Sequence, residues 1–205
     1  MVSLKSAFPA IAALCLLAPL GGCQVQKVPE EVAKRIEYVE TEATLGRDAV
    51  NRTAKSLENF REAPDAQVKT AYADYAAAVE RLEEKAGGVN IVFNTAEAGA
   101  KRYFAEWEKQ IADITNDDLQ NKAADRRAEM LSAYADLQTK IDAARASFKP
   151  FMSNLQDIKK AVAADTTVAG RSAAMPTIRQ ALDQKETVVK NIDTVIDALK
   201  KIRSK

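Results

Sequence analysis

Residues 64–114 read PDAQVKTAYADYAAAVERLEEKAGGVNIVFNTAEAGAKRYFAEWEKQIADI, and apolar side chains recur in them at seven-residue steps. One row consists of Tyr72, Val79, Ala86, Phe93, Ala100, Trp107 and Ile114, and the row beside it of Val68, Tyr75, Leu82, Val89, Ala96 and Tyr103. Two such rows on one helix form a continuous apolar stripe, here called the seam, which needs partner helices along its length. A helix of this size is roughly 75 Å long. The sequence therefore predicts an elongated all-α protein.

Three further segments carry a seam of the same kind, which predicts four long helices in an antiparallel bundle or coiled coil. We expect helices over about 29–62, 65–114, 117–163 and 171–203, with the longest loop at 164–170. The first seam consists of Val32, Ile36, Val39, Ala43, Gly46, Val50, Thr53, Leu57 and Phe60. The third consists of Ala123, Met130, Tyr134, Leu137, Ile141, Ala144, Phe148, Phe151, Leu155, Ile158 and Val162, and the fourth of Met175, Ile178, Leu182, Val189, Ile192, Ile196 and Leu199.

Two places within these helices invite a different interpretation. Gly87-Gly88 followed by the apolar run 89–93 resembles a turn and a strand, but the seam keeps its phase across the glycines, which favours a helix with a soft point. Pro150 removes a backbone donor from the third helix, yet the seam is in phase on both sides, so we expect a kink rather than a break. Asn116 is the expected N-cap of the third helix, and Ser172 or Thr166 that of the fourth.

The N-terminus has the features of a secretory signal. Lys5 precedes the short apolar run 10–17, and Leu20-Gly21-Gly22-Cys23 follows, which resembles the lipobox of bacterial lipoproteins. We therefore expect a signal peptide over 1–22, cleavage between Gly22 and Cys23, acylation of Cys23 by palmitate or a similar chain, and a tether over 23–28. The alternative is an ordinary signal peptide with a chance Cys. Because Gln24, not Asp, follows Cys23, the outer membrane is the expected location, with the protein facing the periplasm.

The composition argues against nucleic-acid binding, metal binding and catalysis. The formal net charge is +1, which gives no field for nucleic acid, and the absence of His removes the commonest general base and metal ligand. Cys15 leaves with the signal peptide, so no disulfide is expected. Asp117 and Asp118 lack the spacing of a calcium loop, and the aromatic side chains of the second helix occupy seam positions typical of a core. We expect no enzyme, no cofactor and no metal.

Several segments resemble one known family. They are 104–108 (FAEWE), Asn116 with Leu119, and the 148–152 turn (FKPFM) after a Tyr-containing helix. Together they are similar to the bacterial lipoproteins of the domain of unknown function 2959, over most of the mature chain. The family's tract with His and Asn after the Pro has no counterpart in 158–162, as in a divergent member. The resemblance implies a helical lipoprotein and no catalytic residues to transfer.

The C-terminus is basic and has three interpretations. Lys200, Lys201 and Arg203 complement the negative end of the last helix, or they contact anionic lipid, because an up-down-up-down bundle returns the C-terminus to the anchored end. In the third, Lys205 is joined to peptidoglycan, as in the small murein-linked lipoproteins, although the same topology points it toward the membrane.

The unequal lengths of the first two helices suggest both a geometry and a function. An upright bundle would bring the turn at Asn116 to the bilayer, so we expect the bundle to tilt along the membrane, to bend at Gly87-Gly88 or to start its first helix away from the bundle end. Unequal helices also leave apolar surface uncovered, which invites an envelope protein partner or a second copy. The leading hypothesis is a non-enzymatic scaffold or adaptor; the alternative is a peptidoglycan- or lipid-binding module.

Overall fold

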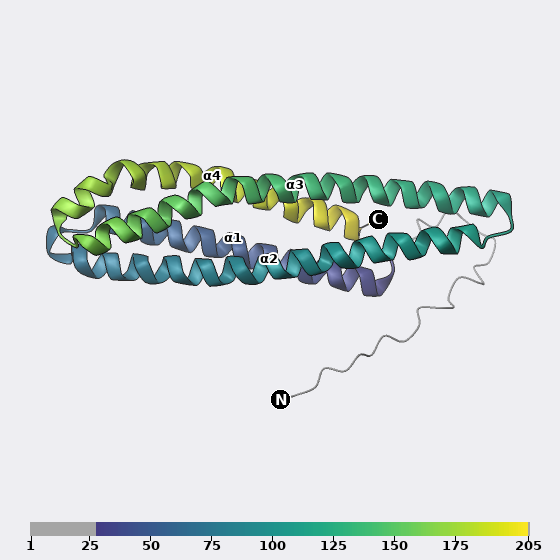
Figure 1. Ribbon diagram of the computed structural model, residues 1–205, viewed down its shortest axis with the longest axis horizontal. Helices are drawn as coiled ribbons and strands as arrows, with labels where there is room; N and C mark the ends of the chain where they lie inside the picture. The colour runs from purple at the N-terminus through teal and green to yellow at the C-terminus, as the bar shows by residue number, and fades with distance from the viewer. Residues whose placement is uncertain (1–27, 205) are drawn as a thin grey trace, which may run out of the picture.

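The computed structural model describes residues 28–204, which form four antiparallel helices (Figure 1). The elements are α1 (Glu30–Glu62), the short 3-10 helix η1 (Asp65–Gln67), α2 (Val68–Ala112), α3 (Asp117–Ala164) and α4 (Val168–Arg203). Each helix packs against the next, and α4 returns to pack against α1. The predicted all-α bundle is confirmed, and the described residues contain no strand.

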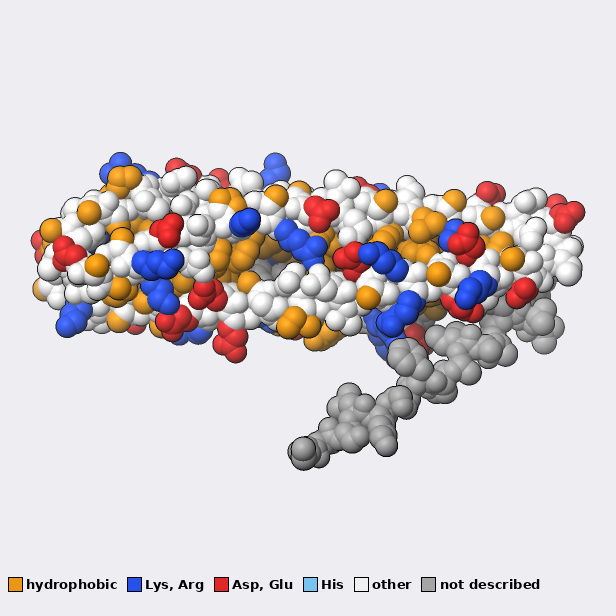
Figure 2. Space-filling model, viewed as in Figure 1, with side chains coloured by type: hydrophobic (Ala, Val, Ile, Leu, Met, Phe, Trp, Pro, Cys, Tyr) orange, Lys and Arg blue, Asp and Glu red, His pale blue; other side chains and the backbone are white. Residues whose placement is uncertain are grey.

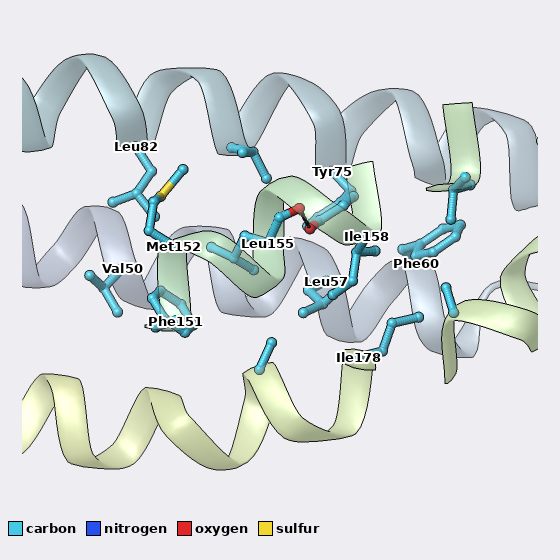
Figure 3. Packing of buried hydrophobic residues seen from close by; sticks show 14 of the residues in the cluster. Val50, Leu57, Phe60, Tyr75, Leu82, Phe151, Met152, Leu155, Ile158 and Ile178 are labelled. Carbon is cyan, nitrogen blue, oxygen red and sulfur yellow. Dashed lines mark hydrogen bonds between the residues drawn. The ribbon is translucent and has the colours of Figure 1, made fainter. Parts of the chain in front are cut away.

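The larger core lies where all four helices overlap, toward the α1–α2 and α3–α4 connections. Leu57 and Phe60 of α1 meet Tyr75 of α2, Leu155 of α3 and Ile178 of α4 there (Figure 3). Each large side chain buried in this way stabilises the fold by about 1.5 to 3 kcal/mol. The Tyr75 hydroxyl donates to the Leu155 carbonyl over 2.6 Å, so its polar atom is also satisfied.

A second core cluster occupies the other half of the bundle. Val39, Phe104, Met130, Leu137 and Leu199 are among its buried members. Between 83 and 103, no α2 side chain is fully buried. The seam of α2 is therefore continuous in sequence but deeply covered only in its first part and around Phe104.

The local signals for helix continuity are mostly confirmed. α2 runs unbroken through Gly87-Gly88, and α3 runs unbroken through Pro150. α2 is preceded by η1 and ends at Ala112, slightly inside the predicted limits. The Asn116 side chain accepts a hydrogen bond from the Leu119 amide over 3.0 Å, which is the expected N-cap of α3.

The predicted loop over 164–170 is wrong. The connection is only 165–167, and α4 begins at Val168. Thr167, not Ser172 or Thr166, is the N-cap and accepts from the Gly170 amide over 3.5 Å. Asp165 accepts from the amide and hydroxyl of Thr167, and these hydrogen bonds lower the pKa of Asp165. Asp165 and Thr167, which were predicted to belong to a longer loop, thus form a short capping structure at the start of α4.

The predicted seam of α4 is also displaced. Ile178, Ile196 and Leu199 are buried as expected, but the other expected residues are only half-buried. The buried positions beside them are Ala174, Ala181, Val188, Val195, Ala198 and Ile202. Small alanines let α4 approach its neighbours closely, and the larger side chains then lie at the margin of the interface.

Candidate functional site at the uneven end of the bundle

The start of α1 and the end of α4 lie together. The Arg203 guanidinium is 3.1 Å from Glu40 Oε2 and 3.9 Å from Glu37 Oε2, and Ile202 is buried in the second core cluster. This contact confirms that the C-terminus returns to the side of the bundle on which the described chain begins. Arg203 therefore has a structural role in joining two helix ends.

The other basic residues of the tail differ from Arg203. Lys200 and Lys201 are exposed on the last turns of α4, and neither has an ion-pair partner within residues 28–204. They complement the negative end of the helix dipole and are free to contact a ligand. The predicted sites at Gly22, Cys23 and Lys205 lie outside the described residues.

Beyond the paired ends of α1 and α4, α2 and α3 continue as a two-helix hairpin (Figure 1). We call residues 104–127 the extension. Thr53 Oγ1 lies 3.2 Å from the Ala78 carbonyl oxygen, and antiparallel counting from that pair places Glu30 level with about residue 101 of α2. α2 then continues to Ala112, so the extension projects by roughly 16 Å.

Polar contacts hold the two arms of the extension together. Arg127 donates to the Phe104 carbonyl over 3.1 Å and to Glu108 Oε2 over 2.8 Å. Gln120 donates to the Ile111 carbonyl over 3.2 Å. These residues lie outside the seam rows, so no pattern in the sequence singled them out. The arms are paired by specific contacts, whereas Leu119 near the tip remains 58% exposed.

An aromatic cluster lies at the base of the extension. The Phe104 ring centroid is 5.6 Å from those of Tyr103 and Tyr134 and 6.3 Å from that of Trp107. In the other core cluster, Tyr75 stacks on Phe60, and the partly buried Tyr72 meets Phe60 edge-on. The seam aromatics are thus core residues in two separate groups, as their positions predicted.

The surface between α2 and α3 is hollowed and shows apolar side chains (Figure 2). Polar pairs bridge it: Lys159 donates to Glu80 over 2.7 Å, and Arg145 donates to Asn94 over 2.8 Å. The hydrogen bond lowers the pKa of Glu80 and raises that of Lys159, so both remain charged near neutral pH. These contacts join α2 to α3.

Residues 28–204 contain no group of three or more His, Cys, Asp or Glu side chains placed to share a metal ion. Among the helices in that range, none has the combined length and apolar character needed to span a bilayer.

Comparison with known proteins identifies a family. No curated protein and no solved structure matches the chain. The profile of a family described as "protein of unknown function (DUF2959)" matches residues 26–203, from just before α1 to the end of α4. This match covers both core clusters and the extension, and it confirms the resemblance found in the sequence. The chain belongs to the DUF2959 family.

Proposed function

We propose that this chain is a non-enzymatic lipoprotein of the bacterial outer membrane, whose elongated bundle serves as a periplasmic scaffold or adaptor for another envelope component. The lipobox around Cys23 supports the anchor. Two or three acyl chains, at about 0.8 kcal/mol per buried methylene, hold a protein stably at a bilayer. The uneven end of the bundle supports the scaffold.

The extension is the observation that carries the proposal. It projects roughly 16 Å past the start of α1, and a six-residue tether over 23–28 spans at most about 20 Å. The turn at 113–116 therefore lies near the bilayer that holds the anchor. A paired hairpin with an exposed Leu119 close to the membrane is suited to contact a neighbouring envelope protein.

The anchor is tested by metabolic labelling with a palmitate analogue. Cys23→Ser is expected to abolish the label and to release the protein from the membrane fraction, because acylation needs the thiol. Cys15→Ser is the matched control, since Cys15 lies in the predicted signal peptide and its loss leaves labelling unchanged. Label that persists in Cys23→Ser would contradict the anchor.

The scaffold is tested by photo-crosslinking in cells. A photoreactive residue at Leu119 is expected to give a discrete adduct with an envelope protein, whereas one at Thr187, exposed on α4, gives none. No adduct at Leu119, or the same adducts from both positions, would contradict the proposal that the extension contacts an envelope protein.

The second candidate function is binding of lipid or peptidoglycan by the tail. The exposed Lys200 and Lys201, which have no ion-pair partner in the described chain, favour it. Boiling envelopes in detergent and collecting the insoluble sacculi distinguishes the two ligands. Retention that requires Lys205 indicates a covalent wall linkage. Complete release, with vesicle binding that requires Lys200 and Lys201, indicates lipid.

A further inference from the structure

Three glycines of α2 have no explanation within the fold. Apart from its chain neighbours and the nearby backbone of α2 itself, a Cβ atom built at Gly87, Gly88 or Gly99 would meet nothing within 4 Å. By contrast, a Cβ at Gly46 would lie 3.3 Å from Val89 Cγ2, because two helices approach closely there. A glycine in a helix interior costs about 1 kcal/mol relative to alanine. The open space in front of these three glycines is therefore available to something outside the chain.

The residues around the glycines are arranged symmetrically about position 93. Reading outward from that position, the pairs are Ile91 and Thr95, Gly88 and Ala98, Gly87 and Gly99, and Glu84 and Arg102. All are exposed except Gly99, which is half-buried. The sequence of this stretch thus has the same spacing of small residues in both directions, with an acidic residue at one end and a basic residue at the other.

These residues share the outward face of α2. One flank of the helix meets α1, where Lys85 pairs with Glu42 at 2.7 Å. The opposite flank meets α3, where Asn94 accepts from Arg145 at 2.8 Å. Phe93 packs against the second core cluster. With 3.6 residues per turn, the four symmetric pairs lie within about 60° of the direction opposite Phe93, so they form one face between the flanks.

We propose that this face binds a second copy of the chain, with the two α2 helices antiparallel across a two-fold axis near residue 93. Glu84 of each copy then lies level with Arg102 of the other, which gives two ion pairs. Neither residue has an ion-pair partner within the described chain. A parallel arrangement in register would instead place Glu84 against Glu84, so the charges select the antiparallel pair.

The same pairing covers the most exposed large hydrophobic residue of the described chain. Ile91 is 67% exposed, and in the antiparallel register it lies level with Thr95 of the second copy. The glycines permit the two backbones to approach closely, so that Ile91 is enclosed by both helices. We call this contact the α2 pair.

The α2 pair also agrees with the placement of α1. The two-fold axis passes between the two α2 helices, in the direction from the α1 flank to the α3 flank. Rotation about this axis leaves α1 of both copies on the same side. α1 of both copies then lies on one side of the dimer, as two proteins on one membrane require. The pairing itself needs no lipid, so it stands or falls separately from the proposed anchor.

The first test is thiol cross-linking of the full chain in cells. With Ile91→Cys, a short bismaleimide is expected to give a covalent dimer, because the two thiols lie about 6 Å apart along the helices. Thr187→Cys on α4 and the unsubstituted chain, which reports any reaction of Cys15 or Cys23, are expected to give none. No dimer from Ile91→Cys, or equal dimer from Thr187→Cys, would overturn the proposal.

The second test reverses the charges in the Ile91→Cys background. Glu84→Arg and Arg102→Glu are each expected to lower dimer yield roughly tenfold, and the two together are expected to restore it. Within one chain these residues lie about 27 Å apart along a single helix, so the rescue has no intramolecular explanation. Gly88→Leu is expected to abolish the dimer with an unchanged circular dichroism spectrum, since position 88 is exposed and a Cβ built there meets open space in the monomer. Single variants that cross-link normally, or a double variant without rescue, would overturn the antiparallel α2 pair.

Discussion

Tyr75 is the largest fully buried side chain of the described bundle, and burial raises its pKa far above the ordinary value. Above the unfolded-state pKa of about 10, only the unfolded chain releases the phenol proton. The stabilisation is therefore complete below pH 10 and falls above it, by about 1.4 kcal/mol per pH unit for this group. In urea unfolding between pH 9 and 11, Tyr75→Phe is expected to lose stability less steeply than the native chain. An equal fall of the unfolding free energy with pH in both chains would contradict the proposed effect of burial on the Tyr75 pKa.

Arg203 has a structural role, whereas its neighbours Lys200 and Lys201 are available to bind a ligand. Arg203 pairs with Glu40, whose side chain is only 16% exposed, whereas Lys200 and Lys201 are exposed and without ion pairs in the described range. Arg203→Gln is expected to lower the free energy of unfolding by about 1 kcal/mol, and Lys201→Gln to leave it within about 0.5 kcal/mol. Thermal melts of the two variants check this. Equal losses would show that the Arg203 contact contributes nothing specific.

At the scale of the helix, substitutions of two helical glycines have opposite expected effects. Gly88→Ala is expected to stabilise the isolated monomer by about 1 kcal/mol, because its Cβ meets open space and alanine favours a helix. Gly170→Ala is expected to destabilise, because its Cβ would lie 1.9 Å from the Asp165 carbonyl oxygen. Chemical unfolding at low protein concentration measures both. A Gly88→Ala chain that is less stable would show that the glycine serves the monomer.

The helices also show how well the heptad rows predict the buried positions. In α1 and α3 the rows predicted most of the buried residues, among them Leu57 and Leu155. Along α2 the buried position near the end is Phe104, one residue beyond Tyr103 of the expected row. A row at intervals of 3.5 residues drifts by about 20° per heptad around a helix of 3.6 residues per turn, so the error accumulates along 45 residues.

The candidate sites also differ in how much of each could be predicted from the sequence. Tail residues could be named from the sequence because a run of like charge is local, but the engagement of Arg203 with Glu40 depends on contact between opposite ends of the chain. The extension followed from helix lengths alone, whereas the contacts of Arg127 across it did not, because a polar residue outside the seam carries no periodic signal. Long-range pairing is thus the part that only the structure supplied.

For the whole molecule, stability is expected to be unequal along the bundle axis. Val79 and Leu82 lie in the four-helix core, whereas residues beyond Phe104 are held by two helices only. Local opening requires less free energy where fewer apolar contacts break. Hydrogen exchange followed by mass spectrometry is therefore expected to be faster over 105–112 and 117–125 than over 75–82. Uniform protection along α2 would indicate that the extension is covered in solution, by the second copy or by another partner.

The orientation of the bundle follows from the extension and the proposed anchor. In an upright bundle, the short tether would press the turn at 113–116 against the bilayer. Asp113 in this turn and Asp117 and Asp118 directly after it are exposed carboxylates that anionic head groups repel. Lying along the membrane removes this conflict and places two copies side by side, as the α2 pair requires. We therefore expect the bundle to lie along the membrane.

Energy transfer to a lipid-bound dye measures this in the lipidated chain. Labels at Asn116 and at Ala66, which lies at the opposite end in η1, are expected to report similar short distances. An upright bundle would place Ala66 about 50 Å or more farther from the lipid than the start of α1. Both signals are expected to disappear in Cys23→Ser, which shows that they depend on the anchor. A near Asn116 with a distant Ala66 would instead mean that the acidic turn tolerates the head groups, and the side-by-side arrangement of two copies would then be excluded.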